Sequence, residues 1–214
     1  HTHPLVSTFL YNAVDLSGFK HASKEDIWHY FKEQLLQYSP GEWIFCKGFD
    51  QVLIPTLEPP QISFLDSIAP YNPVVIASQS LHSYWANSLA FKMTGIDKKT
   101  PDPSLSSYYE KDENGELTGY IAEQIAFNPF KKIIINAFGK SNLKNNSIEV
   151  LKDYASNGNT TITSLGLTTS DKNVLRLYEY LSSENISFIN HFLSFVGILP
   201  KKSPVVRHFS FLRY

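Results

Sequence analysis

Residues 147–166, SIEVLKDYASNGNTTITSLG, contain a helix signal, a glycine turn and a strand signal in one continuous stretch. The pattern predicts a helix from about Ser147 to Ser156, which Gly158 ends because glycine readily adopts the left-handed conformation that closes helices. The β-branched run 160–163 that follows is typical of a buried strand. A further helix is expected over 170–182 and a further strand over 186–195. This alternation is the pattern of βα units and indicates an α/β fold.

Residues 21–140 follow a different pattern, in which short strands, prolines and a hairpin predominate. Ser23 is placed to cap a helix that continues to about Tyr38, and Asn114-Gly115 between two β-prone runs predicts a hairpin. The other elements expected are strands at 42–48 and 73–77, helices at 61–68 and 84–93, and a helix from about 121 interrupted at Asn128-Pro129. This segment is interpreted as an α+β subdomain inserted into the βα pattern.

Composition excludes several classes of function. The net charge of −1 and the lack of a basic run argue against a nucleic-acid partner. No apolar stretch approaches the roughly 18 residues that a membrane span requires. The single cysteine, Cys46, rules out an internal disulfide framework, fits a reducing compartment and is expected to be a buried small apolar residue. We therefore expect a cytoplasmic protein, although a signal peptide stays open because the chain does not begin with Met.

The chain begins with His1-Thr2-His3, and histidines two residues apart on a strand point to the same side of it. Two such imidazoles at a strand end can hold a divalent metal in the mouth of a barrel. The alternative is that the pair is a disordered terminus or the remnant of a tag.

A collinear series of motifs makes the sequence resemble the amidohydrolase superfamily, and within it the amidohydrolase 3 group that includes N-substituted formamide deformylases. His1 and His3 match the His-x-His of the group. The other matches, in chain order, are Trp43-Ile44, Gly48–Gln51, Asp66–Pro70, Pro73–Val75, His82–Ala90, Gly95-Ile96, Thr100–Pro103, Asn114-Gly115, Thr118–Glu123 and Gly158–Gly166. Two positions depart from the group, since Leu81 replaces a glycine and Ser164 replaces an aspartate.

The resemblance implies an incomplete piece of a metal-dependent (β/α)₈ barrel with an inserted α+β lid subdomain. In that interpretation residues 1–20 form the end of the first barrel strand and the loop after it. Residues 21–140 form the lid over the active site, and residues 141–214 form early βα units of the barrel. The remaining metal ligands and the catalytic aspartate of the family would then lie beyond Tyr214, so we expect no catalytic residue within this piece and no activity from it alone.

The same resemblance suggests a divalent metal, with zinc as the default, and His1, His3 and Glu123 as its ligands. Glu123 is alternatively a second-shell carboxylate or an ordinary acid at a helix N-terminus. His82 is the candidate to contact a substrate carbonyl or a metal-bound water, and its alternative is a structural imidazole. Asp50 and Gln51 are expected to line the substrate pocket, while Asp50 is equally suited to cap a turn.

These assignments predict a hydrolase that cleaves C–N bonds of amide or formamide type in a small molecule, using a metal-activated water. The alternative is a non-catalytic binding or regulatory protein on the same fold, similar to the exoenzyme regulators of the group. The sequence does not identify the substrate or the oligomeric state.

Overall fold

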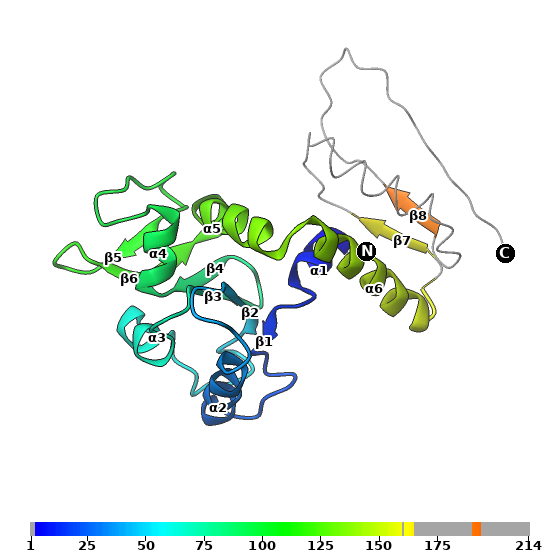
Figure 1. Cartoon of the computed structure of the whole chain (residues 1–214), viewed down its shortest axis with the longest axis horizontal. Helices are drawn as coiled ribbons and strands as arrows, with labels where there is room; N and C mark the ends of the chain where they lie inside the picture. Colours follow the sequence, from blue (N-terminus) through cyan, green and yellow to red (C-terminus); the bar gives the residue numbers. More distant parts are fainter. Residues whose placement is uncertain (1–2, 160, 165–189, 194–214) are drawn as a thin grey trace, which may run out of the picture. The chain divides into compact units, whose positions relative to one another are not determined.

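The computed structural model describes residues 3–159, 161–164 and 190–193, and the chain divides into two compact units (Figure 1). The larger unit consists of Ala13–Gly139, and the smaller unit is formed by the described parts of residues 1–12 and 140–214. The larger unit therefore begins before residue 21, where the inserted subdomain was expected to start. Its first strand adds to the edge of the same sheet, which explains why residues 13–20 group with it.

The larger unit is built on a mixed six-stranded sheet in the order β1-β2-β3-β4-β6-β5. Its strands are β1 Val14–Asp15, β2 Ile44–Phe49, β3 Val74–Ser78, β4 Ser83–Ala86, β5 Tyr109–Lys111 and β6 Leu117–Ala122. The first three strands are parallel, and β4, β6 and β5 continue the sheet in antiparallel pairs. Parallel strands place their carboxyl ends at one edge, so the loops after β2 and β3 emerge side by side.

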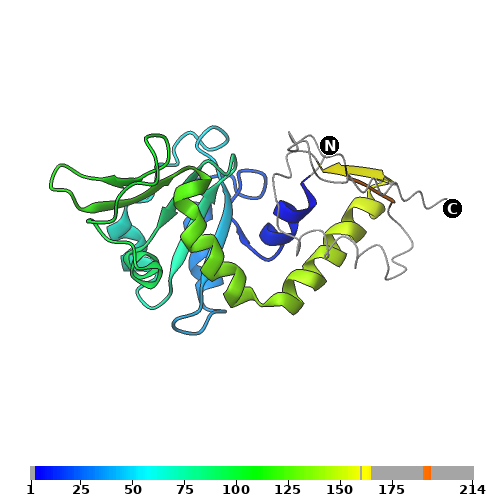
Figure 2. The ribbon, with the colours of Figure 1, turned by 90° about the horizontal axis from the view of Figure 1, so that it is seen from above.

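Helices cover both faces of this sheet. In Figure 1, α2 (Lys24–Leu35) and α3 (Ile62–Ile68) lie below it, and α5 (Glu123–Phe138) lies above it. Seen from above in Figure 2, α5 lies in front of the strands. The lower layer buries Ile27 and Phe31 of α2 and Leu65 of α3 in one cluster with the inward side chains of β2 and β3. In the upper layer, Phe127 of α5 stacks on Tyr84 with ring centroids 4.0 Å apart. The sheet is therefore buried on both sides at its centre, as the apolar runs of β2 and β3 require.

Several expected elements are confirmed. Ser23 caps α2, since its Oγ accepts the Asp26 N–H at 3.1 Å. The strands β2 and β3, the short helix α3 and the β5–β6 hairpin all lie where the sequence predicts them. Gly95 ends α4 (Ser88–Thr94) in the left-handed conformation, and Cys46 is fully buried, which raises the pKa of its thiol. Each of these features depends on local sequence signals.

The helix predicted over 84–93 is wrong in its first half. Residues Ser83–Ala86 form β4, which pairs with β3 on one side and β6 on the other, and the helix α4 begins only after Asn87. Tyr84 and Trp85 are aromatic residues that suit a strand, and Asn87 caps the helix through its side chain. As a result, His82 lies in a strand-to-strand turn.

The interruption predicted at Asn128-Pro129 is also wrong, because α5 runs through Pro129. Proline removes one hydrogen bond from a helix interior, at a cost of about 3 kcal/mol. Here Ala126, Phe127 and Phe130 bury one face of the helix on both sides of the proline, and this packing keeps the helix continuous. None of the helices in the described part of the chain is long and apolar enough to cross a membrane.

The smaller unit contains α1 (Pro4–Leu10), α6 (Lys140–Ser156), β7 (Thr161–Ser164) and β8 (Asn190–Leu193). The two strands pair in parallel, as βα units require, although the helix expected over 170–182 lies outside the described residues. α6 starts seven residues earlier than the predicted Ser147. Ser147 therefore lies inside the helix. There its Oγ donates to the Leu143 carbonyl one turn back, as serine does within helices.

Candidate functional site

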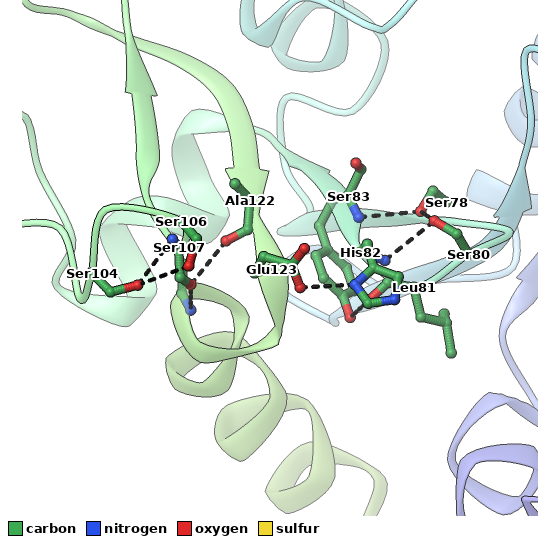
Figure 3. Close-up of polar contacts among 12 residues, drawn as sticks. Ser78, Ser80, Leu81, His82, Ser83, Ser104, Ser106, Ser107, Ala122 and Glu123 are labelled. Atoms are coloured by element: carbon green, nitrogen blue, oxygen red, sulfur yellow. Dashed lines mark hydrogen bonds and ion pairs between the residues drawn. The ribbon is translucent and has the colours of Figure 1, made fainter.

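Two neighbouring segments of the larger unit contain strained backbone. Leu81, in the β3–β4 turn, has φ 60°, and Glu123, where β6 meets α5, has φ 66° (Figure 3). Among the described residues, these are the positions other than glycine that adopt the left-handed region. Such conformations cost about 1–2 kcal/mol each for residues with a side chain, and they gather at sites where function requires them.

The two segments are joined by His82 and Glu123. The His82 Nδ1 lies 2.8 Å from Oε2 of Glu123, and the Glu123 N–H donates to the His82 carbonyl, also at 2.8 Å. Residue 83 pairs with residue 122 across β4 and β6, and this register brings together two side chains 41 positions apart. The side chains are 63% and 41% exposed, so the pair is open to solvent.

Ser107 holds Glu123 in its strained conformation from a loop outside the sheet. Its Oγ donates to the Ala122 carbonyl at 3.0 Å and accepts the Ala126 N–H at 2.8 Å. Because Ala122 has no side chain that can cap α5, the fully buried Ser107 performs that role from a distant part of the sequence. Sequence analysis did not identify Ser107, since only the fold places it at this helix end.

Tyr84 holds Leu81 in a similar way. Its hydroxyl donates to the Leu81 carbonyl at 2.6 Å, and the Leu81 N–H donates to Ser78. Burial and, to a smaller extent, the Glu123 carboxylate raise the pKa of Tyr84 above its ordinary value. The hydroxyl therefore stays protonated at neutral pH and remains a donor to the turn. Both strained residues are thus fixed by buried partners, and the His82–Glu123 pair is preorganised.

The pair has a definite chemical capability. An ionised carboxylate only accepts hydrogen bonds, so the neutral tautomer of His82 that donates to Glu123 is the one with its proton on Nδ1. This tautomer leaves the lone pair of Nε2 available to accept a proton or to bind a metal. Histidines that bind metals or transfer protons are commonly oriented in this way by a carboxylate.

A cleft of about 640 Å³ is lined by Asp50 and Gln51 among other residues, while neither His82 nor Glu123 belongs to its lining. Asp50 also caps a turn, because its Oδ1 accepts the Val52 N–H at 2.8 Å. The Gln51 amide donates to the Leu57 carbonyl at 2.8 Å. Ser80 and Ser83, on either side of His82 in sequence, line the cleft as well. The cleft and the His82–Glu123 pair therefore share the β3–β4 turn.

The expected metal ligands are not all described. His1 and the strand expected there lie outside the described residues, and His3 stands immediately before α1 in the smaller unit. Within the larger unit, the third candidate, Glu123, contacts His82. Within residues 3–159, 161–164 and 190–193, no three His, Cys, Asp or Glu side chains form a group able to hold a metal. An imidazole and a carboxylate are nevertheless suitable zinc ligands, so the pair fits as part of a larger set.

The strain at Leu81 leads to a stability prediction. Glycine normally destabilises a folded chain by about 0.5–1 kcal/mol relative to alanine, but at a positive φ the order should reverse. We expect the Leu81→Gly variant to be more stable than the Leu81→Ala variant by about 1 kcal/mol. Urea denaturation of the two variants measures this difference, and both lack the leucine side chain. An alanine variant as stable as the glycine variant would show that residue 81 is not strained in solution.

Comparisons with known proteins found related sequences and similar folds. The sequence profile of the amidohydrolase family matches residues 1–191. The chain is 30% identical over 142 residues to the exoenzymes regulatory protein AepA of Pectobacterium carotovorum subsp. carotovorum, a match that covers 65% of this chain and 30% of that protein. It is 30% identical over 126 residues to an N-substituted formamide deformylase of Arthrobacter pascens, covering 59% of this chain and 23% of that enzyme.

Two solved structures are similar in fold. They are uncharacterized metal-dependent hydrolases from Pyrococcus horikoshii OT3 and Pyrococcus furiosus, with TM-scores of 0.56 and 0.55 and 22% sequence identity each. Each comparison covers 90% of this chain but only 35% and 36% of the other chains. The chain thus spans about a third or less of the proteins it matches.

Proposed function

This chain belongs to the amidohydrolase family, and from that membership we propose that it forms part of a metal-dependent hydrolase that cleaves C–N bonds of amide or formamide type. In this proposal the larger unit is the lid subdomain, and the smaller unit contains the first βα units of a (β/α)₈ barrel. The 30% identity to an N-substituted formamide deformylase supports the choice of bond. A small-molecule substrate is consistent with a cleft of about 640 Å³.

The observation that carries the proposal is the His82–Glu123 pair. Hydrolysis of a C–N bond requires a group that takes a proton from water and returns one to the departing nitrogen. Nε2 of His82 has the lone pair for this transfer, and Glu123 fixes the ring through Nδ1 at 2.8 Å. The strained backbone on both sides of the pair is the kind of cost that a fold retains where positioning matters.

The metal belongs to the same proposal. His1, His3 and Glu123 would hold a divalent ion, with zinc as the default, together with ligands from the rest of the protein. When bound, such an ion lowers the pKa of a coordinated water and polarises the scissile carbonyl. This chain's own part is to supply imidazole and carboxylate donors and to orient the His82 ring beside them.

Metal content tests this function. We expect the complete protein that contains this chain to purify with stoichiometric divalent metal, measured by elemental analysis. The His1→Ala/His3→Ala double variant should lose most of that metal, because two ligands of the set are removed. The matched control is His29→Ala, since His29 is an exposed helix residue paired with Glu33. If the complete protein contained no metal after growth in added zinc, the proposed hydrolase function would be refuted.

That negative result would favour the second candidate, a non-catalytic regulatory module. The match to an exoenzymes regulatory protein, which covers 65% of this chain, is the observation in its favour. A regulator on this fold would need the cleft or the His82 turn for binding, but it would not need the metal.

A further inference from the structure

We propose that the cleft beside the β3–β4 turn is a binding site for small organic cations, specifically primary amines attached to a flat apolar body. The inference concerns which molecule the larger unit recognises, and its test requires neither metal nor turnover. It is argued from the position of the cleft, its aromatic wall and the charges at its rim.

The position of the cleft is one that commonly binds ligands. Phe49 and Asp50 at the end of β2, and Ser78 at the end of β3, contribute to its lining. These are the carboxyl ends of neighbouring parallel strands, where open α/β sheets bind their ligands. Its volume of about 640 Å³ lies within the range of small-molecule sites. A molecule the size of a substituted benzene therefore fits.

One wall of the cleft is aromatic and rigid. Phe49, Trp85 and Tyr120 follow one another across β2, β4 and β6, with ring centroids 5.1 Å apart for the first pair and 5.8 Å for the second. Phe49 and Trp85 are almost completely buried and support the wall from behind, so Tyr120 is the ring of the three that offers a partly exposed face. The Tyr120 hydroxyl is hydrogen-bonded to Ser83 Oγ at 3.0 Å, which fixes the third ring. The exposed face of the Tyr120 ring can stack on a flat apolar group and also attract a cation.

The charges that line the cleft are negative. Asp50 and Glu110 line it, and its lining includes no lysine, arginine or histidine. Both carboxylates are held in place, Asp50 by the Val52 N–H at 2.8 Å and Glu110 by the Thr118 hydroxyl at 2.6 Å. Each of these contacts uses one carboxylate oxygen, so the other can receive an ammonium group. The combination favours a cation over a neutral molecule and disfavours an anion.

The test measures binding of three probes of similar shape to the full chain by ligand-observed NMR and tryptophan fluorescence. The probes are 2-phenylethylamine, 2-phenylethanol and phenylacetate, which differ in charge at neutral pH. We expect saturable binding of the amine, binding of the alcohol that is roughly tenfold weaker, and no binding of the acid. Equal binding of all three probes, or no saturable binding of the amine, would overturn the inference.

Two variants test whether the carboxylates of Asp50 and Glu110 cause the preference for the amine. Asp50→Asn and Glu110→Gln should each weaken binding of the amine about fivefold and leave the alcohol unchanged, because partly exposed ion pairs contribute about 1 kcal/mol. The control is Glu116→Gln, since Glu116 is an exposed carboxylate of the same hairpin that pairs with Lys98 and does not line the cleft. If neither variant affects the amine, the proposal is wrong. The assay contains no metal and involves no turnover, so its failure would leave the hydrolase proposal intact.

Discussion

Replacing His82 by alanine in the complete protein should lower kcat/KM by roughly 10²- to 10⁴-fold, the usual contribution of a positioned proton-transfer group. The variant should fold normally, because the His82 side chain is 63% exposed and its contact with Glu123 is at the surface. Steady-state kinetics on a formamide or amide substrate measures the first effect, and urea denaturation measures the second. The His29→Ala variant is the control, since it removes an imidazole of similar exposure that pairs with a carboxylate elsewhere.

Two further measurements separate proton transfer from a structural role. Added imidazole should restore part of the activity of the His82→Ala variant, because a free ring can occupy the vacated space and a purely structural histidine would not be rescued this way. Glu123→Gln should cost roughly 10–100-fold, the usual effect of removing a carboxylate that orients a histidine. Unchanged kcat/KM in His82→Ala would contradict the role that we propose for the pair.

The sequence named both members of this pair but could not show that they form one. Glu123 was expected to bind metal and His82 to contact substrate, as separate residues. Their contact depends on the register of β4 with β6, and the sequence around β4 was interpreted as helical. A non-local register is set by packing across the whole sheet, so a local pattern gives no direct signal for it. The role of Ser107 at the start of α5 likewise gives no local signal in the sequence.

The structure gives a physical reason for two positions in the family motifs, residues 81 and 48. Leu81, where the group has glycine, stands at φ 60°, a conformation that glycine adopts without strain. Gly48 has φ 82°, and a Cβ atom on it would lie 2.7 Å from the Ser17 Cβ, so a side chain cannot be accommodated there. The departure at residue 81 and the glycine at residue 48 therefore both concern backbone conformation. A sequence motif alone does not show whether a glycine is needed for backbone conformation or for contact with a ligand, and the structure does.

Local signals predicted most of the larger unit, while the proposed metal site would combine residues that are distant in sequence. The cap at Ser23, the turn at Gly115 and the apolar strand β3 each operate within a few residues and are confirmed. The proposed metal ligand set instead combines His1 and His3 with Glu123, which lies more than a hundred positions later in the sequence. Such a set can be proposed from a family resemblance, but its geometry cannot be derived from spacing.

Asn87 connects three parts of the larger unit through one fully buried side chain. Its Oδ1 accepts the Val74 N–H at the start of β3 and the Ala90 N–H in the first turn of α4, both at 3.0 Å. Its Nδ2 donates to the carbonyls of Asn72 at 2.8 Å and Ala69 at 3.2 Å. All four hydrogen-bonding positions of the amide are used, and water does not reach the group. The residue therefore acts in stability, although it belongs to the family motif that contains His82.

The Asn87→Ala variant should consequently lose about 3–5 kcal/mol of the free energy of unfolding. The loss combines about 1 kcal/mol for the helix cap with about 1 kcal/mol, the low end of the usual range, for each of the three other backbone groups left without a partner. Against a total stability of roughly 5–15 kcal/mol, this brings the larger unit close to unfolding at room temperature. Ser88→Ala is the control, since it removes a hydrogen bond to Asp66 from the same helix end on the exposed surface, and it should cost about 1 kcal/mol or less. Urea denaturation of both variants gives the comparison. Equal losses would mean that water replaces the Asn87 contacts, and that burial at this junction is less complete than the structure shows.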